Sequence, residues 1–507
     1  MSDELRAVAR TFRQSLPATG EVSVIQLGGL DRTGIPVVQA NLLSPGTPVV
    51  TGHGYGFAPI EGEVGALGEL CEEVHCADWV ARHPGVASSF DELVRTRGAR
   101  AVIDPMTLCL PAGAGYTGDT VLRWVEARRW PGGEPVLIPD EWIASHNFDL
   151  PPGERLITPI TNGLGAGLDL EHAIGHGIME LLQRDGNVVG FRALDQGVVI
   201  DLDAVRDEPV RALLAHLREL GIDVTAKLAS TEFGITNLYV VGNDRGMPAS
   251  PLQVTACGEA AHPDKHRALR KALLEFCGSR ARKVGTHGEP EMLRRVMPAE
   301  HVERQLAAVQ LDQEEPRALH AMAEWLDQDA ATLRGRLSDT VFSHKRTVRF
   351  SELPDAAAEQ VATSAARLTL LLERLAAQGM EPVVVDCSPA GGPVRAVKVV
   401  VPGLESETMS YGRIGRRGVE RLRARGDALI LDAPREGARR VLLRPEDEER
   451  AGGPAWFDAV LADRIVGSLY PLYRETGCFS AQLLRQQRRT AEGQQSRAAT
   501  KEMEDAS

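Results

Sequence analysis

The stretch TNGLGAGLDLEHAIGHGIMELLQRD, residues 161–185, combines a glycine-rich turn with an amphipathic helix. From Leu170 onward, apolar residues recur every three to four positions, and Asp185-Gly186 predicts the end of the helix. Asp169 precedes the helix as its expected N-cap, because its side chain can accept hydrogen bonds from the first free amides. Glu180 and Arg184 are four residues apart and are therefore neighbours on one polar face. The stretch thus predicts a strand–turn–helix unit that presents a pair of opposite charges.

Two other helices follow the same plan, GEVGALGELCEEVHCADWVARH (62–83) and DKHRALRKALLEFCGSRARK (264–283). Glu69 and Glu72 share a face of the first, and Asp264 is the expected N-cap of the second. Carboxylates grouped in this way suit Mg²⁺, which prefers oxygen ligands and takes one or two carboxylates per ion. Any amphipathic helix also carries acids on its solvated face, so spacing alone does not identify a nucleotide site.

The rest of the chain mixes strand and helix patterns, which predicts an α+β fold of mixed β-sheets with flanking helices. Helical periodicity dominates about 298–379. The runs expected to form strands are 22–30, 34–43, 100–105, 135–139, 155–167, 222–229, 236–243, 381–388 and 394–404. We expect three parts: an N-terminal segment (1–28), a main domain (29–417) and a C-terminal extension (418–507) with a polar, disordered end.

Composition excludes several classes of protein. The net charge of −13 over 507 residues argues against a general nucleic-acid binder, which would carry a basic face. No apolar run is long enough to span a bilayer, and no secretory signal is present, so a cytoplasmic protein is expected. The seven cysteines are scattered without a CxxC pair, which predicts reduced and mostly buried thiols.

Several motifs together resemble the YcaO family. Residues 161–185 are similar to its central signature, a Ser-Asn-Gly-x-x-x-Gly turn and a helix ending Glu-x-x-Glu-Arg-Asp. GYGFAPIEGEVGALGELCEE (54–73) and GEAAHPDKHRALRKALLEFCGSR (258–280) resemble its flanking blocks. Shorter similarities are LDRTGIPV (30–37), VVVDCS (383–388), VKVVVPGLE (397–405) and GRIGRR (412–417). They occur in family order over most of the chain, which makes the set specific although each motif is weak alone.

The resemblance implies an ATP and Mg²⁺ site built from the three helices. The metal ligands that it implies are Glu69, Glu72, Glu180 and Glu275. The nucleotide-binding residues that it implies are Thr161, Asn162, Gln183, Arg184 and Arg280, with the two arginines toward phosphate. A Rossmann interpretation of Gly163–Gly167 is weaker, because the spacing is GxGxG rather than GxGxxG.

The chain departs from the family pattern within the motifs themselves. Tyr55 replaces the family lysine, Gly65 a serine and Glu73 an arginine, while His172 and Gln183 replace two glutamates. Thr161 replaces the serine of the turn. Because Asp169 is the expected N-cap, the glutamate lost at His172 belongs partly to a capping box. Gln183 can still offer a carbonyl oxygen to a metal, without the charge. Nucleotide affinity or metal stoichiometry could therefore differ from the family norm.

The family reaction, as the resemblance implies it, activates a backbone amide of a ribosomally made peptide by ATP-dependent phosphorylation of the amide oxygen. The outcome is an azoline, a thioamide or an amidine, depending on the nucleophile. The chain ends KEMEDAS rather than in the proline-rich tail of many azoline-forming members, which slightly favours thioamide formation or another non-azoline outcome. The first motif begins close to the N-terminus, so a separate leader-binding or sulfur-delivering partner protein is expected. The sequence leaves a homodimer open.

Two other functions stay open. A degenerate scaffold that binds a peptide or partner without ATP turnover is motivated by Tyr55, Gly65, His172 and Gln183. A metal-dependent hydrolase is less favoured, because the histidines have no common metal-ligand spacing and HExxH is absent.

Overall fold

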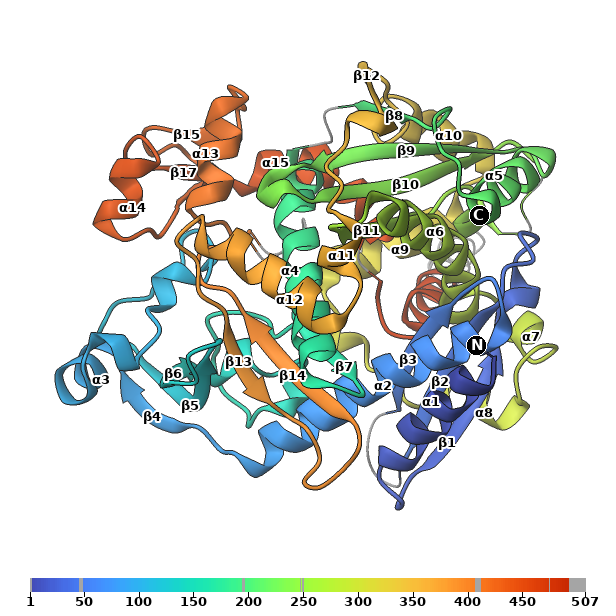
Figure 1. Ribbon diagram of the computed structural model, residues 1–507. Helices are drawn as coiled ribbons and strands as arrows, with labels where there is room; N and C mark the ends of the chain where they lie inside the picture. Colours follow the sequence, from blue (N-terminus) through green and yellow to red (C-terminus); the bar gives the residue numbers. More distant parts are fainter. Residues whose placement is uncertain are drawn as a thin grey trace, which may run out of the picture.

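The computed structural model describes residues 2–44, 49–193, 197–246, 248, 250–405, 412–473 and 475–491. Four β-sheets are flanked by helices, which confirms the predicted α+β class (Figure 1). The helix α4 (Leu170–Ala193) lies at the centre of the view, and the largest and second largest sheets lie on different sides of it.

The described strands form four sheets, and most neighbouring strands are antiparallel. The first sheet has the order β1 (Glu21–Gln26), β2 (Val37–Leu43), β3 (Val50–Tyr55). The second has the order β11 (Cys257–His262), β10 (Thr236–Asp244), β9 (Ile222–Ser230), β8 (Val198–Asp201), β12 (Arg346–Arg349). The third has the order β4 (Val86–Ser89), β5 (Val121–Arg129), β13 (Val383–Asp386), β14 (Arg395–Val400), β7 (Leu164–Gly167), with β6 (Pro135–Pro139) also on β5. The fourth has the order β15 (Ile430–Leu431), β17 (Trp456–Asp458), β16 (Ala438–Arg440).

Three long helices correspond to the three predicted ones: α2 (Pro59–Arg82), α4 and α6 (Lys265–His287). Both predicted N-caps are confirmed. Asp169 accepts a hydrogen bond from the His172 amide at 2.6 Å, and Asp264 accepts from the amides of His266 and Arg267. The other helices are α1 (Ser2–Ser15), α3 (Phe90–Arg97), α5 (Glu208–Glu219), α7 (Pro290–Leu293), α8 (Ala299–Ala307), α9 (Pro316–Asp327), α10 (Ala330–Ser338), α11 (Ala358–Val361), α12 (Ser364–Ala376), α13 (Arg416–Ala424), α14 (Pro445–Arg450), α15 (Ala459–Val466) and α16 (Tyr470–Tyr473).

The predicted end of α4 at Asp185-Gly186 is wrong, because the helix continues to Ala193. Gly186 does not end the helix but allows close packing: a Cβ there would overlap the Asn237 side chain. That side chain donates to the carbonyls of Leu182 and Gln183, so it cannot move away without losing two buried hydrogen bonds. The glycine thus serves a tertiary contact.

Two strand predictions and one helical prediction also need correction. Residues 99–101 and 105–107 form short 3₁₀ turns, with an isolated bridge at Val102 between them. The strand expected before the glycine-rich turn of 155–167 is instead formed by Leu164–Gly167, within that turn. Within the helical stretch 298–379, β12 pairs in parallel with β8, although nearly 150 residues separate them in sequence. Such long-range pairing leaves no mark in the local periodicity.

The helix α2 packs unusually close to β3 because of two glycines. A Cβ at Gly52 or Gly54 would collide with the helix backbone. Backbones can approach in this way only where side chains are missing. As a result α2 lies directly against the face of β3, the edge strand of the first sheet, and its polar residues can reach the β3 backbone.

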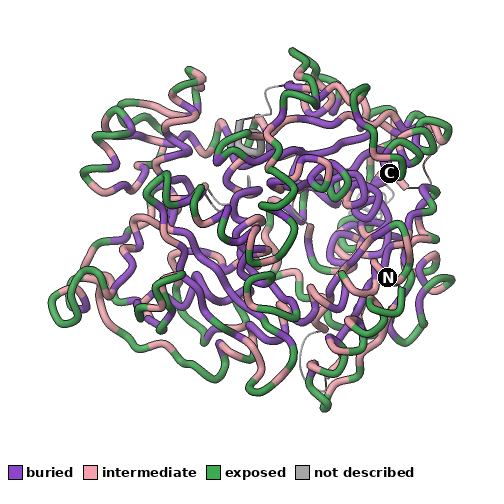
Figure 2. Tube along the Cα trace, viewed as in Figure 1, coloured by how far each residue is buried: buried purple, intermediate pink, exposed green. Residues whose placement is uncertain are grey.

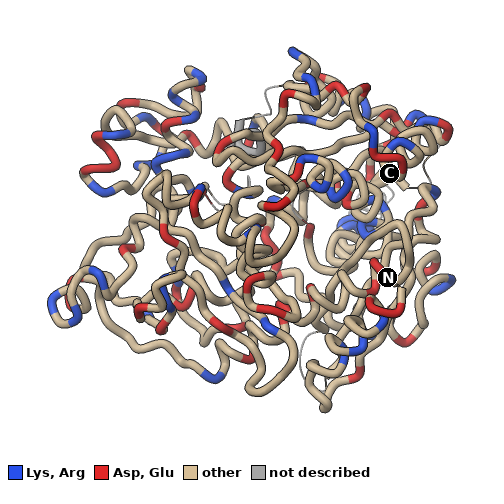
Figure 3. Tube along the Cα trace, viewed as in Figure 1, with Lys and Arg blue, Asp and Glu red and all other residues tan. Residues whose placement is uncertain are grey.

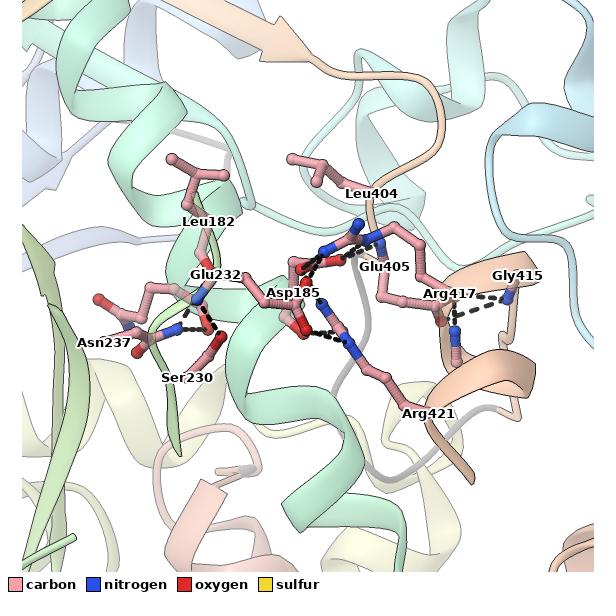
Figure 4. A network of polar contacts seen from close by, with 12 residues as sticks. Leu182, Asp185, Ser230, Glu232, Asn237, Leu404, Glu405, Gly415, Arg417 and Arg421 are labelled. Atoms are coloured by element: carbon pink, nitrogen blue, oxygen red, sulfur yellow. Dashed lines mark hydrogen bonds and ion pairs between the residues drawn. The ribbon is translucent and has the colours of Figure 1, made fainter. Parts of the chain in front are cut away.

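The C-terminal residues pack on α4 through a buried ionic network (Figure 4). Arg417 of α13 binds both oxygens of Asp185, at 3.0 and 2.9 Å, and Arg421 binds the same carboxylate. Glu232 also pairs with both arginines. Burial opposes ionisation of Asp185, but Arg421 and Arg417 outweigh it and lower its pKa. This network holds α13 against the helix that carries the central signature.

The chain end packs on the helical stretch as well. Arg485 binds Asp327 at 2.7 Å, and the Ser480 hydroxyl donates to Glu314. Of the predicted C-terminal extension, residues 418–491 are therefore folded onto the rest wherever the structure describes them. The expected disordered end, 492–507, lies outside the described residues.

The sheets are mostly buried, whereas helices near the surface such as α3 are largely exposed (Figure 2). Charged residues of both signs occur along the whole trace (Figure 3). The prediction for the cysteines is confirmed: all seven are free thiols, and only Cys478 is not buried. None of the described helices is both long and apolar enough to cross a lipid bilayer.

Candidate nucleotide and metal site

The three helices with the shared plan enclose a cavity of about 680 Å³ together with β3 and β7. Its acidic lining residues are Glu69, Glu72, Glu73, Glu180 and Glu275 from the helices, and Asp169 at the start of α4. Its basic lining residues include Arg184, Lys271 and Arg282. All four predicted metal ligands thus line one cavity, although they come from separate parts of the chain.

The two carboxylates of α2 are held by the free edges of two different sheets. Glu69 accepts a hydrogen bond from the His53 amide of β3 at 2.7 Å, and Glu72 accepts one from the Ala166 amide of β7 at 3.0 Å. Both strands lie at the edge of their sheets, so these amides have no strand partner on that side. The helix therefore bridges the two sheets, and each carboxylate is fixed in direction.

The α4 residues form a connected polar row. Glu180 accepts from the Gly163 amide at 2.9 Å and lies 3.6 Å from Arg184, which confirms the predicted neighbour pair. Arg184 and the Gln183 amide group both donate to Glu259, at 2.8 and 3.1 Å. Thr161 also lines the cavity, and Asn162 follows it in the same turn, half-buried. Glu259 was not anticipated from the sequence.

The α6 side contributes Glu275, which accepts a hydrogen bond from the Tyr55 hydroxyl at 2.8 Å. Arg282 lies on the same face two turns later and binds Glu475 of the C-terminal segment, also at 2.8 Å. The attraction of Glu475 raises the pKa of Arg282 further, and burial of Glu475 is outweighed by Arg282, which lowers the Glu475 pKa to about 2. The C-terminal segment thus reaches the wall of the cavity.

Arg280 does not line the cavity, and this prediction needs correction. Its side chain is fully buried and binds Asp31 and Asp244 at 2.9 Å. At 3.6 residues per turn, a position five residues after Glu275 points away from it, whereas the seventh, Arg282, shares its face. The sequence signal for Arg282 was this seven-residue spacing.

Burial and mutual repulsion shape the charge of the cavity. Burial, with Glu73 adding to it, raises the pKa of Glu69 to about 7. Burial raises the pKa of Glu73 to about 7, and it raises the pKa values of Glu72 and Glu275 as well. Carboxylates in this situation ionise readily only when a cation joins them.

This donor set fits Mg²⁺ bound together with phosphate. Carboxylate oxygens are the ligands that Mg²⁺ takes, and Arg184 and Arg282 provide planar donors for phosphate oxygens. Among the described residues, no three acidic, histidine or cysteine side chains converge closely enough to hold an ion by themselves. Such a site needs further oxygens from a ligand or water, which is how proteins commonly bind Mg²⁺.

Comparison with known proteins agrees with this picture. Two relatives are an uncharacterised protein of Methanothermobacter thermautotrophicus and one encoded in the tfuA 3′ region of Rhizobium leguminosarum bv. trifolii. The first is 26% identical over 413 residues, 80% of this chain and 96% of the relative. The second is 23% identical over 434 residues, 82% of this chain and 92% of the relative.

Two solved structures share the fold. YcaO from Methanopyrus kandleri, bound with AMPPCP and Mg²⁺, has a TM-score of 0.54 at 21% identity, covering 82% of this chain and 94% of that one. A heterocyclase in complex with substrate and cofactor has a TM-score of 0.57 at 17% identity over 82% of this chain. The chain spans about half of that heterocyclase, 54% of its length.

The family match itself covers most of the cavity-forming elements. Residues 53–405, well over half of the chain, match the family described as YcaO cyclodehydratase, ATP- and Mg²⁺-binding. These residues include all of α2, α4, α6 and β7, and the end of β3. The chain therefore belongs to the YcaO cyclodehydratase, ATP- and Mg²⁺-binding, family.

Proposed function

We propose that the protein uses ATP and Mg²⁺ to activate backbone amides of a peptide by phosphorylating the amide oxygen. One observation carries this proposal: five carboxylates and two arginines from three helices line one cavity. Family membership supports it, as does the M. kandleri YcaO structure, which holds AMPPCP and Mg²⁺.

In this proposal Glu69, Glu72, Glu180 and Glu275 hold Mg²⁺. Arg184 and Arg282 bind the phosphates, and Arg282 takes the role first expected of Arg280. Thr161 and Asn162 border the nucleotide from the glycine-rich turn, and Gln183 contributes its amide from the helix. Its nitrogen already donates to Glu259, so the amide orientation is fixed and the oxygen is the atom left to face a ligand.

ATP supplies a phosphoryl group that turns a poor leaving group into a good one. A nucleophile forms a bond to the amide carbon, the former amide oxygen takes the phosphoryl group, and its C–O bond then breaks to release phosphate and leave ADP. The protein aligns the reactants and neutralises phosphate charge. Sulfide as the nucleophile gives a thioamide, a side-chain Cys, Ser or Thr gives an azoline, and an amine gives an amidine.

The peptide would be presented by a separate leader-binding or sulfur-delivering protein. Full turnover by the single chain, without a helper, would contradict this part of the proposal. Mass spectrometry of the product distinguishes the modifications, because exchange of oxygen for sulfur adds mass whereas azoline formation removes water.

A scaffold without turnover is the second candidate function, and one contact favours it. The Tyr55 hydroxyl donates a hydrogen bond to Glu275, one of the four proposed metal ligands. Burial, together with that carboxylate, raises the pKa of Tyr55 well above its usual value. A tyrosine that keeps its proton cannot replace a cationic lysine toward phosphate. If the protein is such a scaffold, the Glu69→Gln/Glu72→Gln variant should still bind the partner.

The test is isothermal titration of ATP with Mg²⁺ into the wild type and the Glu69→Gln/Glu72→Gln variant. We expect micromolar binding that the double variant weakens at least about tenfold, since it removes two charges from the metal site. Glu63→Gln is the matched control, because Glu63 lies on the same helix and pairs near the surface with Arg13 at 3.9 Å. Absence of binding by folded wild type, alone and with the partner, would refute the proposal.

A further inference from the structure

Glu259 of β11 is a buried carboxylate that supports the candidate site from behind the cavity wall. It is 5% exposed, and it is not among the described residues that line the cavity. Three side chains of α4 donate to one of its oxygens, Oε2: Arg184 at 2.8 Å, Asn187 at 3.0 Å and Gln183 at 3.1 Å. Of these three, Gln183 and Arg184 line the cavity. A single carboxylate oxygen thus fixes two side chains of the cavity wall.

The direction of the Glu259 side chain follows from its strand. Successive side chains of a strand point to opposite faces, and Gly258 faces α6 so closely that a Cβ there would collide with the helix backbone. Glu259 therefore points toward α4. Asn237 of the neighbouring strand β10 also reaches α4, where it donates to the carbonyls of Leu182 and Gln183. The second sheet thereby holds this turn of α4 at two points.

The contact between Gln183 and Glu259 accounts for one departure from the family pattern. That pattern has a glutamate at position 183, whereas Gln183 carries no charge. A glutamate there would place two carboxylates at the 3.1 Å that now separates the Gln183 amide nitrogen from Glu259. Two carboxylates this close do not ionise readily together. Glutamine at 183 is therefore the neutral partner that a carboxylate at 259 requires, and the negative charge lies on β11 instead of α4.

We propose that Glu259 is a positioning residue of the nucleotide site, which holds Gln183 and Arg184 in place and carries the negative charge that position 183 lacks. The inference deepens the proposed function and rests on it, because it takes both side chains to act on ATP and Mg²⁺.

The hydrogen bond to Glu259 bears on Gln183 as a metal ligand. An amide whose N–H donates to a carboxylate carries more negative charge on its oxygen, which is the atom left for Mg²⁺. Groups behind a ligand orient it, and their loss typically lowers metal affinity about 10–100-fold. Arg184 lies between Glu259 at 2.8 Å and Glu180 at 3.6 Å, so its guanidinium is fixed at the cavity wall. Both effects depend on the charge of Glu259.

The test exchanges the two side chains. Glu259→Gln removes the charge, Gln183→Glu adds a second one, and the double variant Gln183→Glu/Glu259→Gln restores the total charge with the carboxylate moved to α4. Asn187→Leu is the matched control, since Asn187 donates to the same oxygen but is not among the described lining residues. AMPPCP is titrated into each full-length protein by calorimetry over a range of Mg²⁺ concentrations, and melting temperatures are recorded without ligand.

We expect Glu259→Gln to weaken AMPPCP binding at least about tenfold and to raise the Mg²⁺ concentration needed for half-maximal binding. Adding Gln183→Glu to this variant should restore the affinity to within about threefold of the wild type, because the charge returns to the site. Gln183→Glu alone should lower the melting temperature near neutral pH, since the two carboxylates repel. Asn187→Leu should leave the AMPPCP affinity within about threefold of the wild type.

A double variant that binds AMPPCP no better than Glu259→Gln would overturn the inference, because the charges at 259 and 183 would not be exchangeable. Equal losses of affinity in Asn187→Leu and Glu259→Gln would also overturn it, since Glu259 would then only anchor α4 on the sheet. An unchanged Mg²⁺ dependence in Glu259→Gln would have the same meaning. Failure of the proposed function has a different signature, because the wild type itself would then not bind AMPPCP with Mg²⁺.

Discussion

Replacing Glu69 by Gln should make the free protein more stable at alkaline pH and at the same time weaken its metal site. The variant keeps the size of the side chain and an oxygen that can accept from the His53 amide, so mainly the charge changes. Burial raises the pKa of Glu69 from 4.5 to about 7. The folded protein therefore holds the proton more tightly than the unfolded chain does.

The direction in which stability changes with pH follows from this difference in proton binding. Between pH 4.5 and about 7 the unfolded chain releases the proton while the folded protein retains it, so stability falls as pH rises through this window. The difference between the two pKa values corresponds to about 3 kcal/mol, an upper limit because Glu69 is partly exposed to solvent. The wild type loses this amount at high pH, whereas the Gln variant has no proton to lose.

The assay is urea unfolding of both proteins in EDTA, at about pH 5 and about pH 8. We expect Glu69→Gln to differ from the wild type by less than about 1 kcal/mol at the lower pH and to be up to about 3 kcal/mol more stable at the higher pH. Glu63→Gln should show no such trend. A Glu69→Gln variant that is less stable at both pH values would refute the reasoning, since the carboxylate would then have a stabilising partner in the free protein.

Three other changes test contacts around the site. Gly186→Ala should destabilise the protein by about 1–3 kcal/mol, because a Cβ there overlaps a buried side chain. Gly175→Ala on the same helix has open space around its Cβ and should be neutral or stabilising by about 1 kcal/mol. Thermal melts that give the two variants equal stability would contradict this. Asp185→Asn should cost about 3–5 kcal/mol in urea unfolding, because two arginines lose their shared charge; a cost below about 1 kcal/mol would show that the network is dispensable. A double-mutant cycle of Arg282→Met and Glu475→Gln should give a coupling energy of about 1–3 kcal/mol at neutral pH. This coupling should disappear toward pH 2, because the lowered pKa of Glu475 keeps the carboxylate charged down to that range. A coupling energy of zero at neutral pH would show that Glu475 does not stabilise Arg282 at the cavity.

The contacts of Glu475 and Asp185 give the C-terminal residues a role that the linear order of motifs does not suggest. Glu475 holds Arg282 at the cavity, and Asp185 joins α13 to the helix that carries Glu180 and Arg184. Arg421 of α13 and Glu475 lie outside the motifs, yet each contacts a residue on one of the central helices, Asp185 of α4 and Arg282 of α6. Changes in this part of the chain should therefore alter nucleotide binding without touching a ligand.

Local sequence was sufficient to predict that the three helices exist, two of their N-caps and the direction of their acidic faces. Periodicity of 3.6 residues places Glu69 with Glu72 and Glu180 with Arg184 whatever surrounds the helix, and Asp169 and Asp264 cap because a short side chain reaches the nearest free amides. The α+β class followed from the same kind of local pattern. Family motifs then linked the three faces to one site before any distance was known.

Only the tertiary structure decided the features that depend on residues distant in sequence. Gly186 lies inside α4, where the Asn237 side chain packs against it, and β12 pairs with β8 across nearly 150 residues. Arg280 forms buried ion pairs with Asp31 and Asp244, whereas Arg282 lines the cavity. Local periodicity reports which face a residue occupies, but the partner on that face is set by burial and close packing between segments, which a single stretch of sequence does not contain.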